Sequence, residues 1–349
     1  MIGTHNIIEG PAQNMSKIAS NSVGLVVTSP PYPMIEMWDD IMSNQNPKIG
    51  EALGENDGYL AYELMHQELD KVWAETERII KPGGFACINI GDATRTIDGK
   101  FQLYPNHSRI IEAFLKLGMS NLPNIIWRKQ TNAPNKFMGS GMLPAGAYVT
   151  LEHEWILVFR KGDKRKFTKE KDKEERRASS YFWEERNLWF SDLWDLKGTK
   201  QKIDKSESRK RSAAYPFELP YRLIQMYSLK GDIVVDPFLG TGTTMLAAMA
   251  SERHSVGYEI DPKFVPIIKT HIQDAGVPFL NAYIKQRLER HLAFVQQRKE
   301  LKGEQAFKHA NDILDTDVVT AQEKQLVINA VDKITTLDNG FEVNYKSLV

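Results

Sequence analysis

The stretch VVTSPPYPMIEMWDD, residues 26–40, carries an apolar strand directly into a rigid corner, Ser29-Pro30-Pro31-Tyr32-Pro33. Each proline fixes its own φ angle and has no N–H to donate, so the corner can neither extend the strand nor begin an ordinary helix. The apolar run VGLVVTS, residues 23–29, predicts a strand that is buried on both faces, as in a parallel sheet.

The segments after this corner predict a helix and a second strand. Apolar residues recur at helical spacing over residues 59–80, and Lys81-Pro82-Gly83-Gly84 ends that helix. FACINIGD, residues 85–92, then predicts the next strand. Strand, helix and strand in this order predict an α/β fold with a mostly parallel sheet and helices on both faces.

The same patterns predict the rest of the chain. We expect a helix over 105–117, strands over 124–128 and 154–160, a helix after 213, a strand over 232–236, a helix over 243–251 and a strand over 254–260. Beyond residue 283, apolar residues lie on one face of YIKQRLERHLAFVQQRKEL and predict an appended helical piece. The expected domain limits are 1–161, 162–212, 213–282 and 283–349.

Length, composition and charge exclude several classes of protein. The 349 residues have ordinary apolar, charged and aromatic fractions and can bury a large core. No apolar run is long enough to span a bilayer, and the start, MIGTHNIIEG, lacks a secretory signal pattern. The single cysteine, Cys87, cannot form an internal disulfide, so we expect a cytoplasmic protein without a membrane partner. Because the formal net charge is zero, any affinity for nucleic acid has to come from local clusters.

Residues 160–212 contain such a cluster, because Lys and Arg outnumber Asp and Glu there. Aromatic residues are interleaved in YFWEERNLWFSDLWD, residues 181–195. Cations and flat rings together are typical of a nucleic-acid contact surface, although a solvated insertion with its own small apolar core has the same composition. The functional interpretation predicts DNA contacts from the Trp183 to Trp194 aromatics and from Lys164, Arg165, Lys166, Arg176 and Arg177.

The segment DPFLGTGTT, residues 236–244, places Gly240 and Gly242 at a strand-to-helix turn, where the backbone can approach a ligand closely. It is not a phosphate-binding P-loop, and Met245 stands where the pyrophosphate fingerprint needs a third small residue. Glu259 ends the following strand, where an acid can accept hydrogen bonds from two ribose hydroxyls. A ligand with a ribose but no pyrophosphate, such as S-adenosyl-L-methionine, fits this pattern; a structural strand–helix connection is the alternative.

Both loops follow strands of one sheet, so we expect them at its carboxyl edge, where ligands bind in such folds. The Ser29 hydroxyl and the Pro30 carbonyl are then hydrogen-bond acceptors on a stiff backbone, with the Tyr32 ring beside them. Acceptors and ring together suit a planar ring that bears an NH₂ group.

The order of these motifs resembles the β class of exocyclic-amino DNA methyltransferases. TSPPY (28–32) resembles motif IV, KPGGFACINIGD (81–92) the strand after it, EHEWILVFRK (152–161) motif VIII, AYPFELPYRLI (214–224) motif X, DPFLGTGTT motif I and VGYEIDP (256–262) motif II. The resemblance covers residues 1–275 without the insertion. It implies a Rossmann-like methyltransferase fold with permuted motif order, a target-recognition region at 162–212 and a C-terminal helical extension.

The resemblance also implies roles for individual residues. The catalytic tetrapeptide would be Ser29-Pro30-Pro31-Tyr32. A target base flipped out of DNA would stack on Tyr32, and its amino group would be held by Ser29 and by the Pro30 carbonyl. Serine at the first position favours the N4 amino group of cytosine over the N6 amino group of adenine. S-adenosyl-L-methionine would be held by Asp236, Pro237, Phe238, Gly240, Gly242, Thr243 and Glu259. Attack at ring carbon 5 would instead need a nucleophilic cysteine, and Cys87 lies inside an apolar strand.

One departure concerns the cofactor adenine. The family often has a Gly-Asp pair before motif IV, whereas here Gly10 is followed by Pro11, so other groups must hold the adenine. We expect the 130–147 loop to close over the flipped base. Double-stranded DNA is the expected partner, and a cognate restriction endonuclease and a homodimer are left open.

Three other functions compete with this one: an RNA base methyltransferase, a non-catalytic DNA-binding subunit and a dehydrogenase. The intact corner and glycine turn disfavour the second, and Met245 disfavours the third. No metal site is predicted, because neither His107 nor His153 has ligands at metal-binding spacing.

Overall fold

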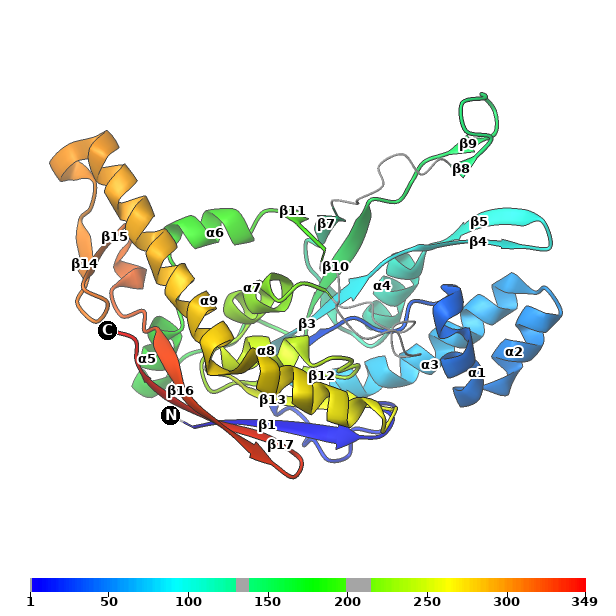
Figure 1. Cartoon of the computed structure of the whole chain (residues 1–349), viewed down its shortest axis with the longest axis horizontal. Coiled ribbons are helices and arrows are strands. Elements are labelled where there is room, and N and C mark those ends of the chain that lie inside the picture. Colours follow the sequence, from blue (N-terminus) through cyan, green and yellow to red (C-terminus); the bar gives the residue numbers. More distant parts are fainter. Residues whose placement is uncertain (1, 130–137, 199–214) are drawn as a thin grey trace.

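A large sheet runs through the middle of the molecule (Figure 1). The computed structural model describes residues 2–129, 138–198 and 215–349, and within these ranges the sheet has eleven strands. Their order is β11 (Leu193–Leu196), β7 (Ile125–Lys129), β10 (His153–Arg160), β3 (Ile80–Ile90), β2 (Val23–Thr28), β12 (Ile233–Asp236), β13 (His254–Glu259), β1 (Ile2–Glu9), β17 (Gly340–Ser347) and β16 (Asn329–Leu337), with β6 (Ser120–Asn121) beside β10.

The centre of this sheet is parallel. Strand β2 pairs in parallel with β3 on one side and β12 on the other, and β12, β13 and β1 continue in the same sense. The antiparallel strands β10 and β17 extend the two sides. The mostly parallel sheet predicted from the sequence is therefore confirmed, and each predicted strand is part of it.

Alternate residues of the central strands face two different helical layers. Val26 packs in a cluster with α3 (Gly58–Ile79) and α4 (Asn106–Lys116). Leu25 and Val27 pack in the cluster that contains α7 (Glu218–Tyr227), α8 (Thr243–Met249) and α9 (Phe264–Lys302). Both faces of β2 are thus buried, which explains its continuous apolar sequence.

The strand order changes direction between β2 and β12. From β2 the chain moves to β3 on one side, whereas from β12 it moves to β13 on the other. Such a point leaves a crevice beyond the carboxyl ends of the two strands. The Thr28 hydroxyl donates a 2.6 Å hydrogen bond to Asp236 Oδ1 and ties these two strand ends together. The proline corner and the glycine turn consequently lie side by side.

The expected recognition region is partly built into the main sheet. It contains α5 (Glu170–Ala178) and α6 (Trp183–Trp189), and β11 pairs in parallel with β7. Trp189 and Trp194 are only 4% and 1% exposed and belong to the core, so the prediction that these rings contact bases is wrong. Trp183 stacks on Phe294 at 5.8 Å. Residues 199–212 of the expected region lie outside the described residues.

The C-terminal part differs from the helical extension that was expected. Helix α9 crosses the expected boundary at 283 and ends at Lys302. It is followed by the hairpin of β14 (His309–Asn311) and β15 (Thr316–Val318), and then by β16 and β17. Strand β17 pairs with β1, with Glu342 opposite Thr4, so the end of the chain completes one side of the main sheet. These strands were not predicted, because the sequence of this part is polar and has no clear strand pattern.

Smaller elements surround the carboxyl edge. Helices α1 (Asp39–Gln45) and α2 (Pro47–Gly54) follow the corner, and the hairpins β4 (Ala93–Ile97)–β5 (Lys100–Tyr104) and β8 (Met138–Gly139)–β9 (Ala147–Tyr148) project away from the sheet (Figure 1). Phe101 and Tyr148 stack at 4.5 Å and join the two hairpins. In the described ranges, no helix is long and apolar enough to cross a membrane.

Candidate active site

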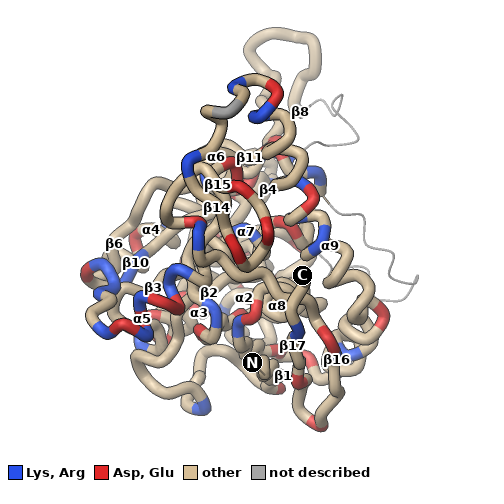
Figure 2. The backbone as a smooth tube through the Cα atoms, turned by 90° about the vertical axis from the view of Figure 1, so that its left-hand side faces the viewer, with Lys and Arg blue, Asp and Glu red and all other residues tan. Residues whose placement is uncertain are grey.

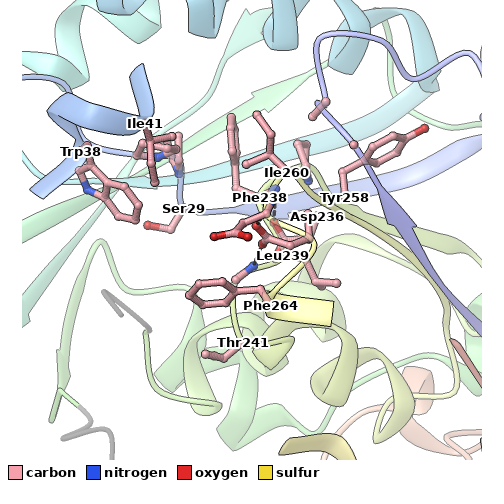
Figure 3. Close-up of a pocket in the computed structure, with 18 of the residues that line it drawn as sticks. Ser29, Trp38, Ile41, Asp236, Phe238, Leu239, Thr241, Tyr258, Ile260 and Phe264 are labelled. Carbon is pink, nitrogen blue, oxygen red and sulfur yellow. Dashed lines mark hydrogen bonds between the residues drawn. The ribbon is translucent and has the colours of Figure 1, made fainter. Parts of the chain in front are cut away.

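A cavity of about 130 Å³ lies at the carboxyl ends of β2 and β12 (Figure 3). Its walls come from the proline corner, the glycine turn, α1 and the end of β13. The lining residues are Gly10, Ala12, Gln13, Ser29, Pro30, Pro31, Trp38, Ile41, Gln45, Tyr215, Asp236, Pro237, Phe238, Leu239, Gly240, Thr241, Thr243, Tyr258, Glu259, Ile260, Asp261 and Phe264. Among the described residues, three carboxylates and no Lys or Arg line this cavity, so its charge suits a cationic ligand.

The structure brings most of the predicted site residues together here. Ser29, Pro30 and Pro31 line the cavity, but Tyr32 lies behind it, against Gly91. Met34, just after the corner, is 1% exposed and has a φ of 67°, which residues other than glycine rarely adopt. A strained residue persists only where its surroundings hold it in place, so the corner is rigidly positioned.

A chain of hydrogen bonds leads from Ser29 into the protein. Ser29 Oγ lies 3.1 Å from the Tyr32 hydroxyl, which donates a 2.8 Å hydrogen bond to Glu154 Oε2. Asn89 Nδ2 donates to the Tyr32 oxygen at 2.8 Å and to Glu154 at 2.7 Å, and Lys129 forms an ion pair with Glu154. These partners come from three neighbouring strands, β3, β7 and β10.

The direction of this chain follows from its members. An ionised carboxylate only accepts hydrogen bonds, so Tyr32 must donate to Glu154 and accept from Ser29. Burial, together with the Glu154 charge, raises the pKa of Tyr32 well above its ordinary value, which keeps its proton in place. The Ser29 hydroxyl therefore donates its proton to the Tyr32 oxygen and not to a group in the cavity. The Ser29 oxygen accepts a long hydrogen bond from Asn89 Nδ2 at 3.4 Å, which leaves one lone pair to accept from a group in the cavity.

The glycine turn forms as predicted. Gly240 and Gly242 have φ angles of 55° and 81°, in the region that favours glycine, and Gly242 is the N-cap of α8. Gly240 lines the cavity, whereas Gly242 does not: a Cβ there would lie 3.0 Å from Ile268 Cγ2. Gly242 therefore serves the turn and its packing on α9.

Glu259 lies beside this turn, at the end of β13. Its carboxylate accepts hydrogen bonds from the backbone N–H groups of Gly240 and Asp261, at 3.1 and 3.0 Å. Burial raises the pKa of Glu259 to about 7, although these two amides oppose the shift. The carboxylate can still accept further hydrogen bonds, because two oxygens offer about four acceptor positions.

Asp236 is also buried at this edge, but its acceptor positions are occupied. It accepts hydrogen bonds from the Thr28 and Thr244 hydroxyls, both at 2.6 Å, from Phe238 N at 3.1 Å and from the Tyr215 hydroxyl at 3.4 Å. Burial raises its pKa, although the two threonine hydroxyls oppose the shift. Asp236 thus holds the cavity wall together more than it offers a free acceptor.

Comparison with known proteins identifies the family of this chain. The model of the N6/N4 DNA methylase family matches residues 23–270. The chain belongs to this family. The cofactor of these methylases is S-adenosyl-L-methionine.

Two archaeal proteins are similar to the methylase over most of its length. The Type II methyltransferase M.MthZI of Methanothermobacter thermautotrophicus is 51% identical over 325 residues, which covers 93% of this chain and 89% of that protein. M.MjaI of Methanocaldococcus jannaschii is 51% identical over 296 residues, with coverages of 79% and 96%.

Solved structures show the same fold. The DNA modification methylase TTHA0409 of Thermus thermophilus, solved in complex with S-adenosyl-L-methionine, has a TM-score of 0.59 and 32% identity, and the match covers 76% of this chain and 92% of that one. The PvuII DNA methyltransferase, described as cytosine-N4-specific, has a TM-score of 0.53 at 17% identity, with coverages of 77% and 86%. At that identity the PvuII match shows the fold alone.

The sequence interpretation missed part of the cavity wall of the methylase. Trp38, Ile41 and Phe264 face it (Figure 3), and Gln45 and Tyr215 also line it. Their only signal was proximity in sequence to the corner, to the motif at 214–224 or, for Phe264, to the motif at 256–262. Gly10 lines the cavity and donates its N–H to the Glu259 carbonyl at 2.8 Å, so the segment without the usual Gly-Asp pair still reaches the site.

The predicted DNA contacts lie elsewhere in the methylase. Arg165 forms an ion pair of 2.8 Å with Asp232, which precedes β12, so it lies at the amino edge of the sheet. Lys164, Arg176 and Arg177 line the same surface as Arg165, and Lys166 is a neighbour in sequence. Strand β12 separates Asp232 from Asp236 by about 13 Å. Phosphate binding by these five residues stays a prediction, and it concerns the edge opposite the cavity.

Cys87 and the histidines have structural surroundings. Cys87 is fully buried, and burial raises the pKa of its thiol, which disfavours a thiolate. His107 hydrogen-bonds Asp92 at 2.7 Å and stacks on Trp155, and His153 packs edge-on against the same ring.

Proposed function

We propose that this methylase is a site-specific Type II enzyme that transfers a methyl group from S-adenosyl-L-methionine to the N4 amino group of a cytosine flipped out of duplex DNA. The observation that carries this proposal is the cavity itself, because Ser29 and Pro30 share it with the glycine turn and Glu259. The Type II names of the two archaeal relatives support site-specific action on DNA.

The charge of the cavity lining suits the cofactor. The cofactor is a sulfonium cation without phosphates, and the cavity has Asp236, Glu259 and Asp261 in its lining and, within the described ranges, no Lys or Arg. We assign the ribose hydroxyls to Glu259 and the adenine to the apolar wall of Trp38, Ile41 and Phe238. When bound, S-adenosyl-L-methionine supplies an electrophilic methyl group.

The corner prepares the amino group for attack. Ser29 Oγ and the Pro30 carbonyl accept the two amino hydrogens, which turns the nitrogen lone pair away from the base ring. With the cofactor bound, the nitrogen lone pair would take the methyl group, S-adenosyl-L-homocysteine would leave with the electron pair of the broken carbon–sulfur bond, and the extra amino proton would pass to water. This chemistry depends on orientation and exclusion of water and needs no covalent intermediate. Flipping the base costs a few kcal/mol, and stacking on an aromatic ring returns about 1–3 kcal/mol.

The choice between cytosine and adenine rests on one residue. Serine at position 29 favours cytosine by its resemblance to N4-specific tetrapeptides. Methylation of the N6 amino group of adenine is the second candidate, because both bases offer an amidine-like NH₂ to the same two acceptors. The PvuII match carries no argument on this choice, because it shows the fold alone.

The partners follow from the same proposal. Duplex DNA is the substrate, and a cognate restriction endonuclease acting on the same site fits the Type II names of the relatives. We further propose that the β8–β9 hairpin, which belongs to the loop predicted to close over the base, contacts DNA. Met142 and Leu143 at its tip are 84% and 69% exposed. Residues 130–137 of that loop lie outside the described residues. A homodimer stays a prediction.

The test is to incubate the protein with S-adenosyl-L-methionine and unmethylated genomic DNA, digest the DNA and identify the nucleosides by mass spectrometry. N4-methylcytosine is the expected product. N6-methyladenine would preserve the mechanism and overturn the choice of base. Methylation of structured RNA in place of DNA would overturn the substrate, and binding of DNA without methylation of either would favour a non-catalytic subunit.

A further inference from the structure

A second, larger cavity of about 1210 Å³ opens at the amino edge of the sheet, opposite the first. We call it the basic groove. Its cations come from the start of β3, the end of β10, the segment after β10, and helices α5 and α6: Lys81, Arg160, Lys164, Arg165, Lys173, Arg176, Arg177 and Arg186. Glu323 is the acidic residue in its lining. Figure 2 shows blue Lys and Arg segments around α5, β3 and β10.

Four of these eight cations share two carboxylates, so only two of their charges are neutralised. Lys81 and Arg165 share Asp232, at 2.6 and 2.8 Å, while Lys173 and Arg177 share Glu170, both at 3.2 Å. The other four cations have no acidic side chain within ion-pair distance in the part of the chain that the structure describes: Arg160, Lys164, Arg176 and Arg186. The groove therefore keeps an excess of positive charge.

The arrangement of α5 and the nearby rings concentrates this charge on one side. Lys173, Arg176 and Arg177 are three and four residues apart and share one face of the helix. The Arg176 and Arg165 guanidinium groups lie over the Phe167 ring, at 4.6 and 5.2 Å from its centre. A guanidinium that is packed on a ring loses little further freedom when it binds phosphate, and its planar fork matches phosphate geometry.

The position of the groove separates it from the target base. The strands that end at the active site begin at the groove, about 13 Å away along β12. A duplex with a base in the active-site cavity would have to wrap around the molecule to reach the opposite edge, and bending 20–30 base pairs by even 40–90° costs about 1–6 kcal/mol. Cations that are spread over several elements suit a repeating phosphate backbone better than a single small anion.

We propose that the basic groove binds the phosphodiester backbone of a second duplex segment, in addition to the one that carries the target base. One methylase molecule then holds two DNA segments, either from two molecules or from distant parts of one. This inference goes beyond methyl transfer, which the groove does not touch. It predicts a second, salt-sensitive binding step for DNA.

The test compares two double variants of the full chain. R176A/R186A removes two groove cations that have no acidic partner, so it breaks no ion pair of the described residues. K285A/R290A is the matched control, because Lys285 and Arg290 are exposed cations of α9 that lie outside the groove lining and form no ion pair with another described residue. Thermal unfolding and binding of S-adenosyl-L-methionine show whether each variant is folded.

Binding of a short mixed-sequence duplex is then titrated at several salt concentrations. The wild-type chain and the control should bind two duplexes per molecule, and R176A/R186A should bind one tightly. The log–log salt slope of the second step should fall by about 2, because each lost phosphate contact contributes about 0.9. One duplex per wild-type molecule, or an equal loss in the control, would overturn the proposal. So would groove-dependent binding of polyglutamate in place of DNA, which would indicate an acidic protein partner. Failure of methyl transfer in the wild type would instead refute the proposed function and leave this measurement intact.

Discussion

The two ends of strand β12 carry the same residue type in opposite surroundings. Asp236, at the carboxyl end, is held by hydroxyl groups and a backbone amide, and burial raises its pKa. Asp232, before the amino end, faces Lys81 and Arg165; burial alone would raise its pKa, but these cations together lower it. The pKa values of two aspartates about 13 Å apart are therefore shifted in opposite directions.

This difference extends to the two edges of the sheet. In the part of the chain that the structure describes, the active-site cavity is lined by carboxylates without Lys or Arg, which suits a sulfonium cofactor, whereas the basic groove is lined mainly by cations, which suits phosphates. A zero net charge conceals both. The location of charge relative to the strand ends, and not the total charge, therefore indicates which ligand each edge can bind.

The largest effect is expected from Ser29→Ala. Under the proposed mechanism this change removes an acceptor for the target amino group, and by analogy with the loss of one transition-state hydrogen bond it should lower the methyl-transfer rate about 10²- to 10³-fold. Single-turnover transfer of a labelled methyl group measures the rate, and calorimetry should show unchanged binding of S-adenosyl-L-methionine.

Cys87→Ala is the control for this prediction. The buried thiol takes no part in the chemistry, so the variant should methylate at close to the wild-type rate. Loss of activity in this variant but not in Ser29→Ala would reverse the assignment and favour a covalent mechanism.

The next largest effect is expected from Glu154→Gln. A neutral amide can donate as well as accept, so the direction of the Ser29–Tyr32–Glu154 chain is no longer fixed. Loss of a buried hydrogen bond to a charged group corresponds to about 1.5–3 kcal/mol, or a rate lowered about 10- to 100-fold. Glu152 is an exposed neighbour, so Glu152→Gln should leave the methyl-transfer rate unchanged. Equal rates for the two variants would show that the chain does not position Ser29.

At the amino edge, the expected effect is on stability. Because the pKa of Asp232 is lowered in the fold, its ion pairs stabilise the protein above the unfolded-state pKa, and this stability is lost as the pH falls through the folded-state pKa. Asp232→Asn should lower the free energy of unfolding by about 2 kcal/mol at pH 7, since two cations lose their partner. Urea unfolding measured from pH 7 down to pH 2 tests this. Asp163→Asn, on the exposed segment nearby, should have no effect, and a difference for Asp232→Asn that stays constant over the whole range would contradict the ionic origin.

The smallest effect is a pH dependence of cofactor binding. The pKa of Glu259 is raised to about 7, so the carboxyl group is increasingly protonated below that pH and accepts hydrogen bonds from ribose less well. The affinity for S-adenosyl-L-methionine should fall by up to about tenfold per pH unit below pH 7. Glu259→Gln should bind weakly at every pH, with no such slope. A slope that survives in Glu259→Gln would assign it to another group.

The elements around the candidate site were predictable because their signals are local. The apolar run before Ser29, the helical spacing of residues 59–80 and the two glycines of the turn each depend on neighbouring residues, and all appear as predicted. The strands of the C-terminal part were missed, because β17 depends on pairing with β1, more than 330 residues earlier in the chain.

Only those residues of the candidate site that belong to a sequence motif were predictable. Ser29, Gly240 and Glu259 meet in one cavity as expected, but no spacing rule indicates that Glu154 supports Tyr32 through a hydrogen bond across 122 residues. The basic cluster was correctly seen as charged, but two of its rings were wrongly expected to contact DNA. Trp189 and Trp194 were interpreted by composition, while their burial is decided by packing against distant helices.

The most direct test of the separation between the two edges is a crystal structure of the protein with S-adenosyl-L-methionine. The account predicts the cofactor at the carboxyl edge, with its ribose hydroxyls on Glu259, its methyl group toward Ser29 and the basic groove without it. A cofactor bound at the amino edge, or in the carboxyl-edge cavity with its ribose away from Glu259 and its methyl group away from Ser29, would contradict the account.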